Sequence, residues 1–301
     1  MFPTRTLENL ARTMLPRGVA RWGKRWAVHA RYRSQCAGCR AGYQTYGERY
    51  PHPVLFIAGL PKSGTTWLER MVSSFPGYHE LLIPDVARHE LRTGGSHDFE
   101  LPDDLFSRFD RMLVLTKMHV HGSPHNTAVL HDAGVPYVVL FRDLRDVAIS
   151  NYFYVRQTPW HLEYDVYADC DLESGLEAFA ERTLGPYADW VRSWHDNHQP
   201  ESGLIVRYEE MLDDSHAVLR SIVDHFKLDA DDALVNQIVE ANQFKRLAAG
   251  RESGEQSESS FFRKGVAGDW KNQFTPRLRD VYKRVIGDFL IDYGYEEDLS
   301  W

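Results

Sequence analysis

The segment from Val54 to Trp67, VLFIAGLPKSGTTW, constrains the fold of this chain more than any other segment. Its first five residues form an apolar run, which is typical of a strand that is buried on both faces. The loop from Gly59 to Thr66 follows, and apolar residues then recur at helical spacing as far as Phe75. A glycine loop between a strand and a helix directs backbone N–H groups at one point, which favours the binding of a phosphate there.

The loop has the spacing of a P-loop, but its lysine stands in a different place. Four residues separate Gly59 from Gly64, and Thr65 occupies the position where a nucleotide triphosphatase needs lysine. The lysine of this chain is Lys62, inside the loop. A cation at this position would lie closer to the α and β positions of a nucleotide, so we expect a ligand that lacks a γ-phosphate. The alternative is an ordinary strand–turn–helix with an exposed Lys62.

The composition is typical of a soluble globular protein. Of its residues, 43% are hydrophobic and 26% are charged. A chain of 301 residues is long enough for one large α/β domain or two smaller ones. No apolar run approaches the roughly 20 residues of a membrane span, and no signal-peptide pattern is present. Three cysteines fit a reducing compartment, so we expect a cytoplasmic protein. The CxxC motif at Cys36–Cys39 has no second pair and is interpreted as incidental.

Charge divides the chain into a basic arm, residues 1–50, and an acidic body, residues 51–301. The arm holds ten Lys and Arg against two Glu, a net charge of +8, which leaves −16 on the body. An acidic body argues against a nucleic-acid partner, because duplex binding requires a basic face. The arm carries apolar residues and two tryptophans at helical spacing, interrupted by Pro16 and Gly18. We expect it to pack across the fold with its arginines solvated; peripheral membrane contact and a transit peptide are the alternatives.

Strands and helices are expected to alternate along the body. Apolar runs predict strands at 54–58, 111–120, 137–141 and 204–207. Helices are expected after the first loop, from about 144, over 172–195 with a break near 185–186, near 214–226 and 231–240, and after 276. We expect a mobile loop at Ser253–Ser260 and a buried face of the last helix formed by Val281, Val285, Ile286 and Leu290. This alternation predicts a parallel sheet with helices on both faces and a ligand at the carboxyl ends of the strands.

Two further clusters could hold a phosphate. Arg142 leaves the third strand at its carboxyl end and Ser150 follows on the next helix, so the two could grip one phosphate; a local ion pair of Arg142 with Asp146 is the alternative. The segment Phe262–Lys271 contains adjacent cations, Arg263 and Lys264, followed by glycines. Such a segment is costly to order without an anion, and a solvated basic turn is the alternative.

A third cluster, Lys117-x-His119-x-His121, could carry catalysis. If this segment is extended, alternation places the three side chains on one face. A lone histidine at the end of a strand is more often structural than catalytic, but this one would neighbour a phosphate site, which makes the two roles about equally expected.

Together these motifs resemble those of the cytosolic-type sulfotransferases that use 3′-phosphoadenosine 5′-phosphosulfate (PAPS). The resemblance spans residues 54–275 and implies a single α/β domain with a central parallel sheet flanked by helices and a P-loop-like 5′-phosphosulfate loop. Residues that match the PAPS-binding positions of the family are Lys62, Ser63, Gly64, Thr65, Thr66, Trp67, Arg142, Ser150, Tyr208, Phe244, Arg263, Lys264 and Gly265. Residues that match its catalytic positions are His119, Lys62, Lys117 and Ser150.

The resemblance implies transfer of a sulfuryl group from PAPS to a hydroxyl or amine of a small-molecule, lipid or glycan acceptor. His119 would act as the general base, the product would be adenosine 3′,5′-bisphosphate (PAP), and no metal would be required. The alternatives are a P-loop kinase acting on a small molecule, which would need the missing Gly-Lys-Ser/Thr ending, and a non-catalytic nucleotide-binding protein of the same fold.

Parts of the chain depart from the family pattern or leave the function open. The dimer motif KxxxTVxxxE would fall at Lys271–Asp280, where Pro276 replaces the valine, so the oligomeric state is open. The Thr-Ser that precedes the family's phenylalanine is missing before Phe244. The acceptor pocket is expected from Tyr78–Asp110, Tyr152–Tyr167 and the loop before Phe261, and its aromatic residues would suit an apolar or aromatic alcohol or serve as core.

Overall fold

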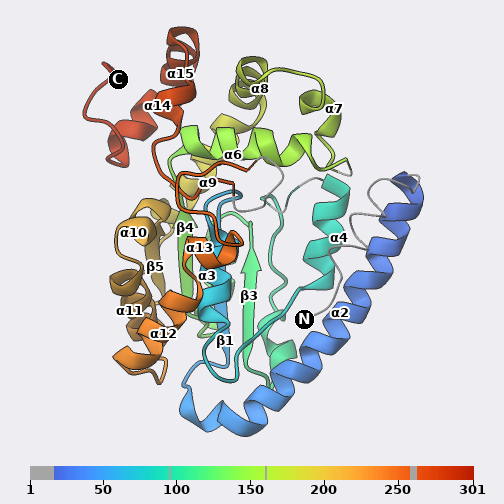
Figure 1. Ribbon diagram of the computed structural model, residues 1–301. Helices are drawn as coiled ribbons and strands as arrows, with labels where there is room; N and C mark the ends of the chain where they lie inside the picture. Colours follow the sequence, from blue (N-terminus) through green and yellow to red (C-terminus); the bar gives the residue numbers. More distant parts are fainter. Residues whose placement is uncertain (1–16, 94, 96, 160, 258–262) are drawn as a thin grey trace.

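The computed structural model describes residues 17–301 except 94, 96, 160 and 258–262, and the side chains of residues 17–29 and 91 are not described. One parallel sheet of five strands, in the order β2-β3-β1-β4-β5, forms the centre of the molecule (Figure 1). The strands are β1 (Val54–Gly59), β2 (His79–Glu80), β3 (Val114–Met118), β4 (Tyr137–Phe141) and β5 (Gly203–Arg207). A parallel sheet of this kind needs helical connections, which cover its faces.

Helices alternate with these strands along the chain. The longer α-helices are α2 (Arg17–Tyr46), α3 (Thr65–Val72), α4 (Pro84–Thr93), α5 (Pro124–Asp132), α6 (Leu144–Arg156), α8 (Leu172–Phe179), α9 (Gly185–Asp196), α11 (Ser215–Phe226), α12 (Asp232–Ala241) and α15 (Pro276–Asp292). The shorter ones are α7 (Tyr164–Tyr167), α10 (Tyr208–Asp213), α13 (Phe244–Leu247) and α14 (Trp270–Gln273). Two 3₁₀ turns, Gly47–Arg49 and Phe106–Phe109, and a π-helical turn, Ala180–Leu184, complete the described elements. No helix in the described part of the chain is both long enough and apolar enough to cross a membrane.

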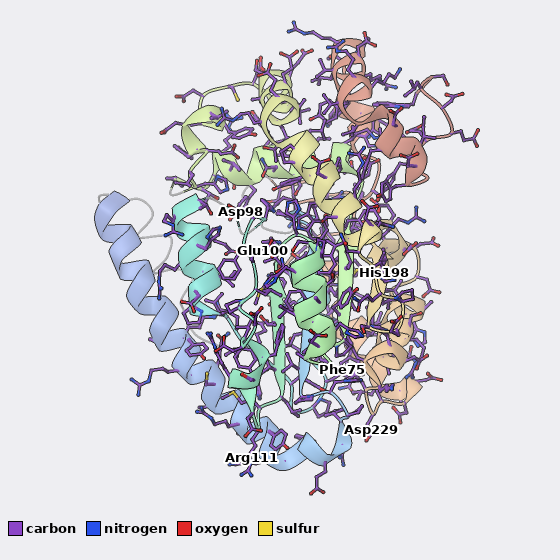
Figure 2. All side chains as sticks on the ribbon, turned by 180° about the vertical axis from the view of Figure 1, so that it is seen from behind. Phe75, Asp98, Glu100, Arg111, His198 and Asp229 are labelled. Atoms are coloured by element: carbon purple, nitrogen blue, oxygen red, sulfur yellow. The ribbon has the colours of Figure 1, made fainter. Side chains whose placement is uncertain are left out.

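Side chains of β1 divide between two hydrophobic layers, one on each face of the sheet. Phe56 and Ala58 join the layer that includes α6, α8, α9 and α15, whereas Leu55 and Ile57 join the layer that includes α3, α11 and α12. All six residues of β1 are buried, because both faces of the central strand are covered. Figure 2 shows the side chains on the ribbon, with Arg111 near the lower end of the view and Asp98 nearer its middle.

The expected α/β fold with a single parallel sheet is confirmed, and several of its elements lie close to their predicted bounds. The predicted strand 137–141 is β4, and 204–207 gains one residue as β5. The strand predicted at 111–120 is shorter than expected and forms only over Val114–Met118. Arg111 has a φ of 53°, a left-handed turn conformation that a strand cannot contain.

The break predicted near Gly185–Pro186 is a change of helix type. The chain passes from α8 through the π-helical turn Ala180–Leu184 directly into α9, whose first residues are Gly185 and Pro186. Proline is tolerated at a helix start, because its missing N–H would have no partner inside the helix there.

The prediction that Val285 is buried is wrong. Its exposed fraction is 41%, whereas Ile286 and Leu290 are buried with Leu278 and Tyr282. Ile286 has a non-helical φ of −132°, which marks a kink inside α15. The buried residues Leu278, Tyr282, Ile286 and Leu290 recur every four positions, and Val285 lies beside this stripe on the exposed side of the helix.

The described part of the basic arm packs against the body. In α2, Cys36 and Cys39 are buried in the core, and Gly42 is so close to Gly77 that a Cβ there would lie 1.9 Å from the Gly77 carbonyl oxygen. Arg33 and Arg40 on the same helix are exposed. For residues 30–46 this matches an arm that packs across the fold with solvated arginines; the division of the chain at residue 50 stays a prediction.

The loop predicted at Ser253–Ser260 is described as far as residue 257. It has no helix or strand there, but Gly254 N donates to Lys264 O at 2.9 Å and Ser257 N donates to Arg263 O at 3.0 Å. Residues 258–260 lie outside the described residues, and the mobility of the loop stays a prediction.

Candidate active site

The Gly59–Trp67 turn joins the end of β1 to the start of α3. Leu60 N donates to Leu140 O at 2.8 Å, which ties the turn to β4. Lys62 and Gly64 have φ angles of 67° and 82°, so the backbone curls through the left-handed region twice before the helix begins. The N–H groups of the first helical turn, at Thr65 and Thr66, have no partner inside the helix and remain available to an anion.

Packing around this turn leaves no room for a side chain at Gly64. A Cβ at Gly64 would lie 2.6 Å from the ring of Tyr208, the first residue of α10. The Tyr208 ring also packs edge-on to Trp67, with centroids 6.2 Å apart, and Trp67 Nε1 donates to the backbone oxygen of Asn242 at 2.9 Å. Gly64 and Trp67 of the turn therefore lie beside Tyr208, another residue that matches a PAPS-binding position.

Ser63 carries a buried polar atom without a partner. Its Oγ is fully buried and makes no hydrogen bond with any described residue. An unpartnered hydroxyl is costly in a protein interior, and it is accounted for if a ligand accepts its hydrogen bond.

Lys62 extends from the turn toward α6. Its Nζ lies 3.9 Å from the centroid of the Tyr154 ring, a cation–π contact. Burial, followed by the nearby Arg142 guanidinium, lowers the pKa of Lys62 to about 7. The ammonium is therefore held in a position where an additional negative charge would stabilise it.

His119 follows the last residue of β3 and is held by backbone groups. Its Nδ1 contacts the carbonyl oxygen of Gly59, and its own carbonyl oxygen accepts from Trp190 Nε1 at 2.9 Å and contacts His97 Nδ1 at 3.2 Å. Because the Gly59 carbonyl can only accept, Nδ1 carries the proton and the lone pair of the neutral ring is on Nε2.

The environment of His119 favours the neutral imidazole. Burial lowers its pKa to about 4, with further lowering by the positive charges of Lys117 and Lys62, against the opposing effect of the Gly59 hydrogen bond. A neutral ring with its lone pair on Nε2 can accept a proton.

The segment Lys117–His121 is not extended throughout, so Lys117 does not share a strand face with His119 and His121 as expected. The strand ends at Met118, so alternation does not continue to His119 and His121. Lys117 Nζ instead forms an ion pair with Glu69 of α3 at 3.0 Å. Lys117 remains close enough to His119 to influence the pKa of its ring.

Arg142 forms a second cationic centre at the carboxyl end of β4. One of its amino groups donates to Asp146 at 3.2 Å and to the backbone oxygen of Val266 at 2.7 Å, and its guanidinium carbon lies 4.3 Å from the Tyr208 ring centroid. The alternative ion pair with Asp146 is therefore present. Arg142 Nε is buried and has no partner among the described residues, so a donor is still available for a ligand.

The segment that contains Arg263 packs against Arg142, although the two are far apart in the sequence. Arg263 and Lys264 both form ion pairs with Asp269, at 2.7 and 2.6 Å. The alternative interpretation of this segment as a solvated basic turn therefore does not hold for these two side chains. Gly265 has a φ of 65° and lies against Phe244, because a Cβ there would be 2.3 Å from that ring.

Ser150 and Tyr154 share a face of α6. They are four residues apart in α6, Ser150 is half-buried, and Tyr154 is the residue whose ring lies beneath Lys62. We predicted Ser150 but missed the contact of Tyr154 with Lys62. Helical spacing from Ser150 was the available signal, whereas nothing in the sequence indicated the pairings of Glu69 and Asp269.

Some of the aromatic residues expected around an acceptor are buried in the interior, and others are accessible. Tyr78 is buried in the core, and Tyr152 and Tyr167 form a small buried cluster, so these three serve the interior. Phe153 and Tyr154 are more accessible, and the guanidinium of Arg263 lies 5.0 Å from the Phe153 ring centroid. Trp160 and Phe261 lie outside the described residues.

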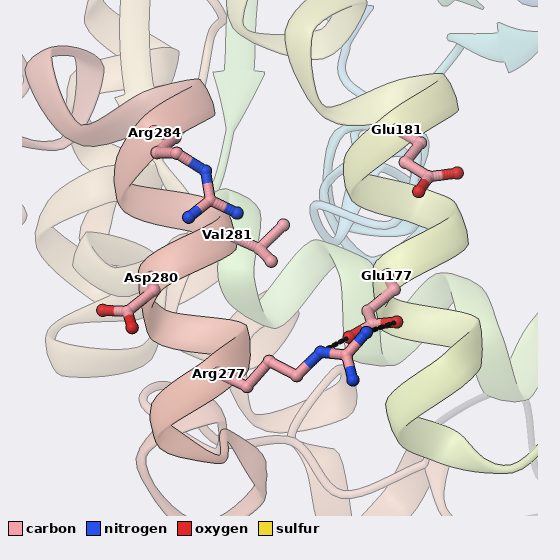
Figure 3. Close-up of a pocket in the computed structure, with 6 residues that line it drawn as sticks. All are labelled: Glu177, Glu181, Arg277, Asp280, Val281 and Arg284. Atoms are coloured by element: carbon pink, nitrogen blue, oxygen red, sulfur yellow. Dashed lines mark hydrogen bonds and ion pairs between the residues drawn. The ribbon is translucent and has the colours of Figure 1, made fainter.

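A separate cavity of about 370 Å³ lies between α8, the π-helical turn and α15 (Figure 3). The residues that line it are Glu177, Glu181, Arg277, Asp280, Val281 and Arg284. Arg277 Nε pairs with Glu177 at 2.6 Å, and the cavity contains none of the predicted site residues. Asp280, which stands at the acidic position of the KxxxTVxxxE motif from which this chain departs, borders this cavity, and Pro276 is the first residue of α15.

Fold and site together define an α/β protein with two cationic centres beside one glycine turn, suited to a ligand with two anionic groups. The sequence model of the family described as "Sulfotransferase domain" matches residues 52–294. The chain therefore belongs to the sulfotransferase family, whose enzymes transfer a sulfuryl group, and the expectations of family, fold class and enzyme class are confirmed.

Relatives and solved structures agree with this family. The chain is 27% identical to Sulfotransferase 1 family member D1 of Rattus norvegicus, over 76% of this chain and 80% of the relative. It is 26% identical to Cytosolic sulfotransferase 3 of Arabidopsis thaliana, over 80% and 77%. Its fold is similar to mouse sulfotransferase SULT7A1 complexed with PAP (TM-score 0.61, 21% identity, 80% of this chain and 86% of that chain). It is also similar to retinol dehydratase in complex with androsterone and PAP (TM-score 0.56, 19% identity, 83% and 85%).

Proposed function

We propose that this protein transfers the sulfuryl group of PAPS to a hydroxyl or amine of a small-molecule or lipid-like acceptor, with His119 as the general base. The observation that carries the proposal is the contact of His119 Nδ1 with the carbonyl oxygen of Gly59. This contact orients the basic Nε2 atom from the same loop that would hold the donor, so base and donor are positioned by one element.

The donor would be held at two ends by separate groups. The turn from Lys62 to Trp67, with the orphaned Ser63 hydroxyl, would hold the 5′-phosphosulfate. Arg142, Ser150, Arg263, Lys264 and Gly265 would hold the 3′-phosphate, and Tyr208 and Phe244 would border the adenine. The presence of PAP in two solved structures of similar fold supports this choice of donor.

His119 Nε2 would accept the proton of the acceptor as the acceptor atom forms a bond to sulfur. The bond between sulfur and the bridging oxygen breaks, and the negative charge goes to the 5′-phosphate of PAP. Lys62 and the backbone N–H groups of the turn would stabilise this developing charge. Lys117, although paired with Glu69, would act on the acceptor side through its positive charge.

The acceptor class and the surroundings of the enzyme belong to the same proposal. Related structures hold retinol and androsterone, which are small apolar alcohols, and we propose an acceptor of this kind here. A cytoplasmic location, peripheral membrane contact through the basic arm and the oligomeric state remain predictions.

Thermal unfolding with different nucleotides tests the proposal. PAP should raise the midpoint of unfolding more than AMP does, and ATP with magnesium should have less effect than PAP. Incubation of the enzyme with labelled PAPS and a panel of alcohols should give sulfated products by mass detection. Stabilisation by ATP with magnesium but not by PAP would favour the kinase alternative, and PAP binding without transfer to any acceptor would favour a non-catalytic protein.

A further inference from the structure

A buried arginine near the start of α6 is enclosed by two tryptophans from distant parts of the chain. The guanidinium carbon of Arg145 lies 3.6 Å from the Trp270 ring centroid and 4.5 Å from the Trp301 ring centroid. The two indole rings are nearly perpendicular, with centroids 5.3 Å apart. The side chain of Arg145 is only 1% exposed, so this contact is a desolvated one.

Two carboxylates complete the enclosure of Arg145. Asp143 accepts hydrogen bonds from the guanidinium of Arg145, the shortest at 2.7 Å. Glu296, in the segment that follows α15, accepts from its other amino group. The 295–301 segment therefore contacts the start of α6 twice, through Glu296 and through Trp301.

Trp270 connects this enclosure to the cationic centre of Arg142. The backbone N–H of Trp270 donates to Asp146 at 3.0 Å, and that of Gly268 donates to the same carboxylate at 2.7 Å. Asp146 also pairs with Arg142, and Arg142 donates to the carbonyl of Val266. The segment that carries Arg263 and Lys264 is therefore anchored immediately after these cations, at Val266, Gly268 and Trp270.

We propose that Trp301 and Glu296 are positioning residues for the 3′-phosphate site, acting through Arg145 and Trp270. This inference rests on the proposed function, because that function assigns the 3′-phosphate to Arg142, Arg263 and Lys264. Removing the Trp301 ring exposes one face of Arg145 and removes a packing partner of Trp270, whose N–H group aligns Asp146. The cations of the site then lose their alignment, while the turn at Lys62 keeps its own contacts.

Variants of Trp301 test this coupling by comparing PAP with AMP, which has no 3′-phosphate. Trp301→Ala should weaken PAP binding by about tenfold in calorimetry and leave AMP binding within about twofold. It should raise the KM for PAPS and leave kcat at saturating donor nearly unchanged. Trp301→Phe should restore PAP binding, because Trp301 Nε1 has no hydrogen-bond partner among the described residues and phenylalanine therefore loses no bond.

A matched control lies two residues away. Leu299 is 49% exposed and packs on Gly287 of α15, so Leu299→Ala changes the same segment without touching the Arg145 enclosure. It should bind PAP as the unmodified protein does. Should Trp301→Ala fail to fold, Glu296→Gln replaces it, with an expected loss of about threefold for PAP and no loss for AMP.

Equal weakening of PAP and AMP in these variants would overturn the inference, because it would indicate a general loss of structure. Unchanged PAP binding in Trp301→Ala would overturn it as well. Failure of the proposed function looks different, since the unmodified protein would then bind PAP no better than AMP.

Discussion

The ammonium of Lys62 and the ring of Tyr154 are in direct contact, with Nζ 3.9 Å from the ring centroid. Lys62 comes from the turn after β1, whereas Tyr154 comes from α6. The contact favours the charged form of a lysine whose pKa burial lowers to about 7. Tyr154 therefore helps to keep a positive charge where the donor's 5′ end would bind.

Replacing Tyr154 should consequently affect donor binding through its ring and not through its hydroxyl. Tyr154→Leu is expected to weaken PAP binding by about twofold to fivefold at pH 7, because a partly exposed cation–π contact is lost. Tyr154→Phe keeps the ring and should bind PAP normally. Calorimetry on both variants measures the difference, and equal losses in the two would assign the effect to the hydroxyl instead.

His119→Ala should retain PAP binding and reduce turnover by about 10²-fold or more, because it removes the general base but none of the phosphate contacts. Initial rates at saturating PAPS, together with calorimetry for PAP, measure the two effects. The matched control is His121→Ala, which should keep most of the activity. Normal turnover in the His119 variant would transfer the catalytic assignment to His121.

The pH dependence of kcat/KM should be a bell with limits near 4 and 7. His119 must be neutral to accept a proton, and its lowered pKa makes it so above about 4, so activity falls as the pH drops through this value. Lys62 must be charged, and its lowered pKa makes activity fall as the pH rises through about 7. Lys62→Arg keeps its charge at all these pH values and should move the alkaline limit upward. An alkaline limit that stays in place in this variant would exclude Lys62 as its origin.

Arg263→Ala should weaken PAP binding by about tenfold or more and AMP binding much less. The carboxylate of Asp269 keeps Lys264 as a partner, so this variant avoids leaving a buried charge unpaired. Calorimetry with both nucleotides is the measurement. Equal losses for both nucleotides would refute the assignment of the 3′-phosphate to this segment.

Gly64→Ala should abolish most of the PAP binding, because a Cβ at this position would meet the Tyr208 ring at 2.6 Å while φ is 82°. Gly134 also has a positive φ, of 62°, but a Cβ there would have no atom within 4 Å. Gly134→Ala therefore reproduces the backbone strain without the clash. We expect both variants to unfold at lower temperature and only Gly64→Ala to lose PAP binding. An equal loss of PAP binding in the two would assign the effect to strain alone, and normal PAP binding by Gly64→Ala would contradict the prediction.

Local sequence signals predicted those parts of the molecule that depend on neighbours along the chain. The apolar run of β4 and the glycine turn at Gly59–Trp67 were placed correctly because propensity and spacing decide them. The prediction for Val285 was wrong because the buried stripe of α15 runs through Tyr282 and Ile286 and leaves Val285 beside it, and packing against the body decides which stripe is buried. Similarly, β3 ends before His119, where the chain turns to place the imidazole against Gly59.

The amino-acid sequence by itself determined the family, the order of four of the five strands, and the residue types that could hold two anionic groups. Only the tertiary structure decided that Glu69 faces Lys117 and that Asp269 faces Arg263, whereas the pair of Asp146 with Arg142 was already an alternative in the sequence. The reason is physical, since a buried charge must find a partner in space, and that partner can lie near in the sequence or far from it.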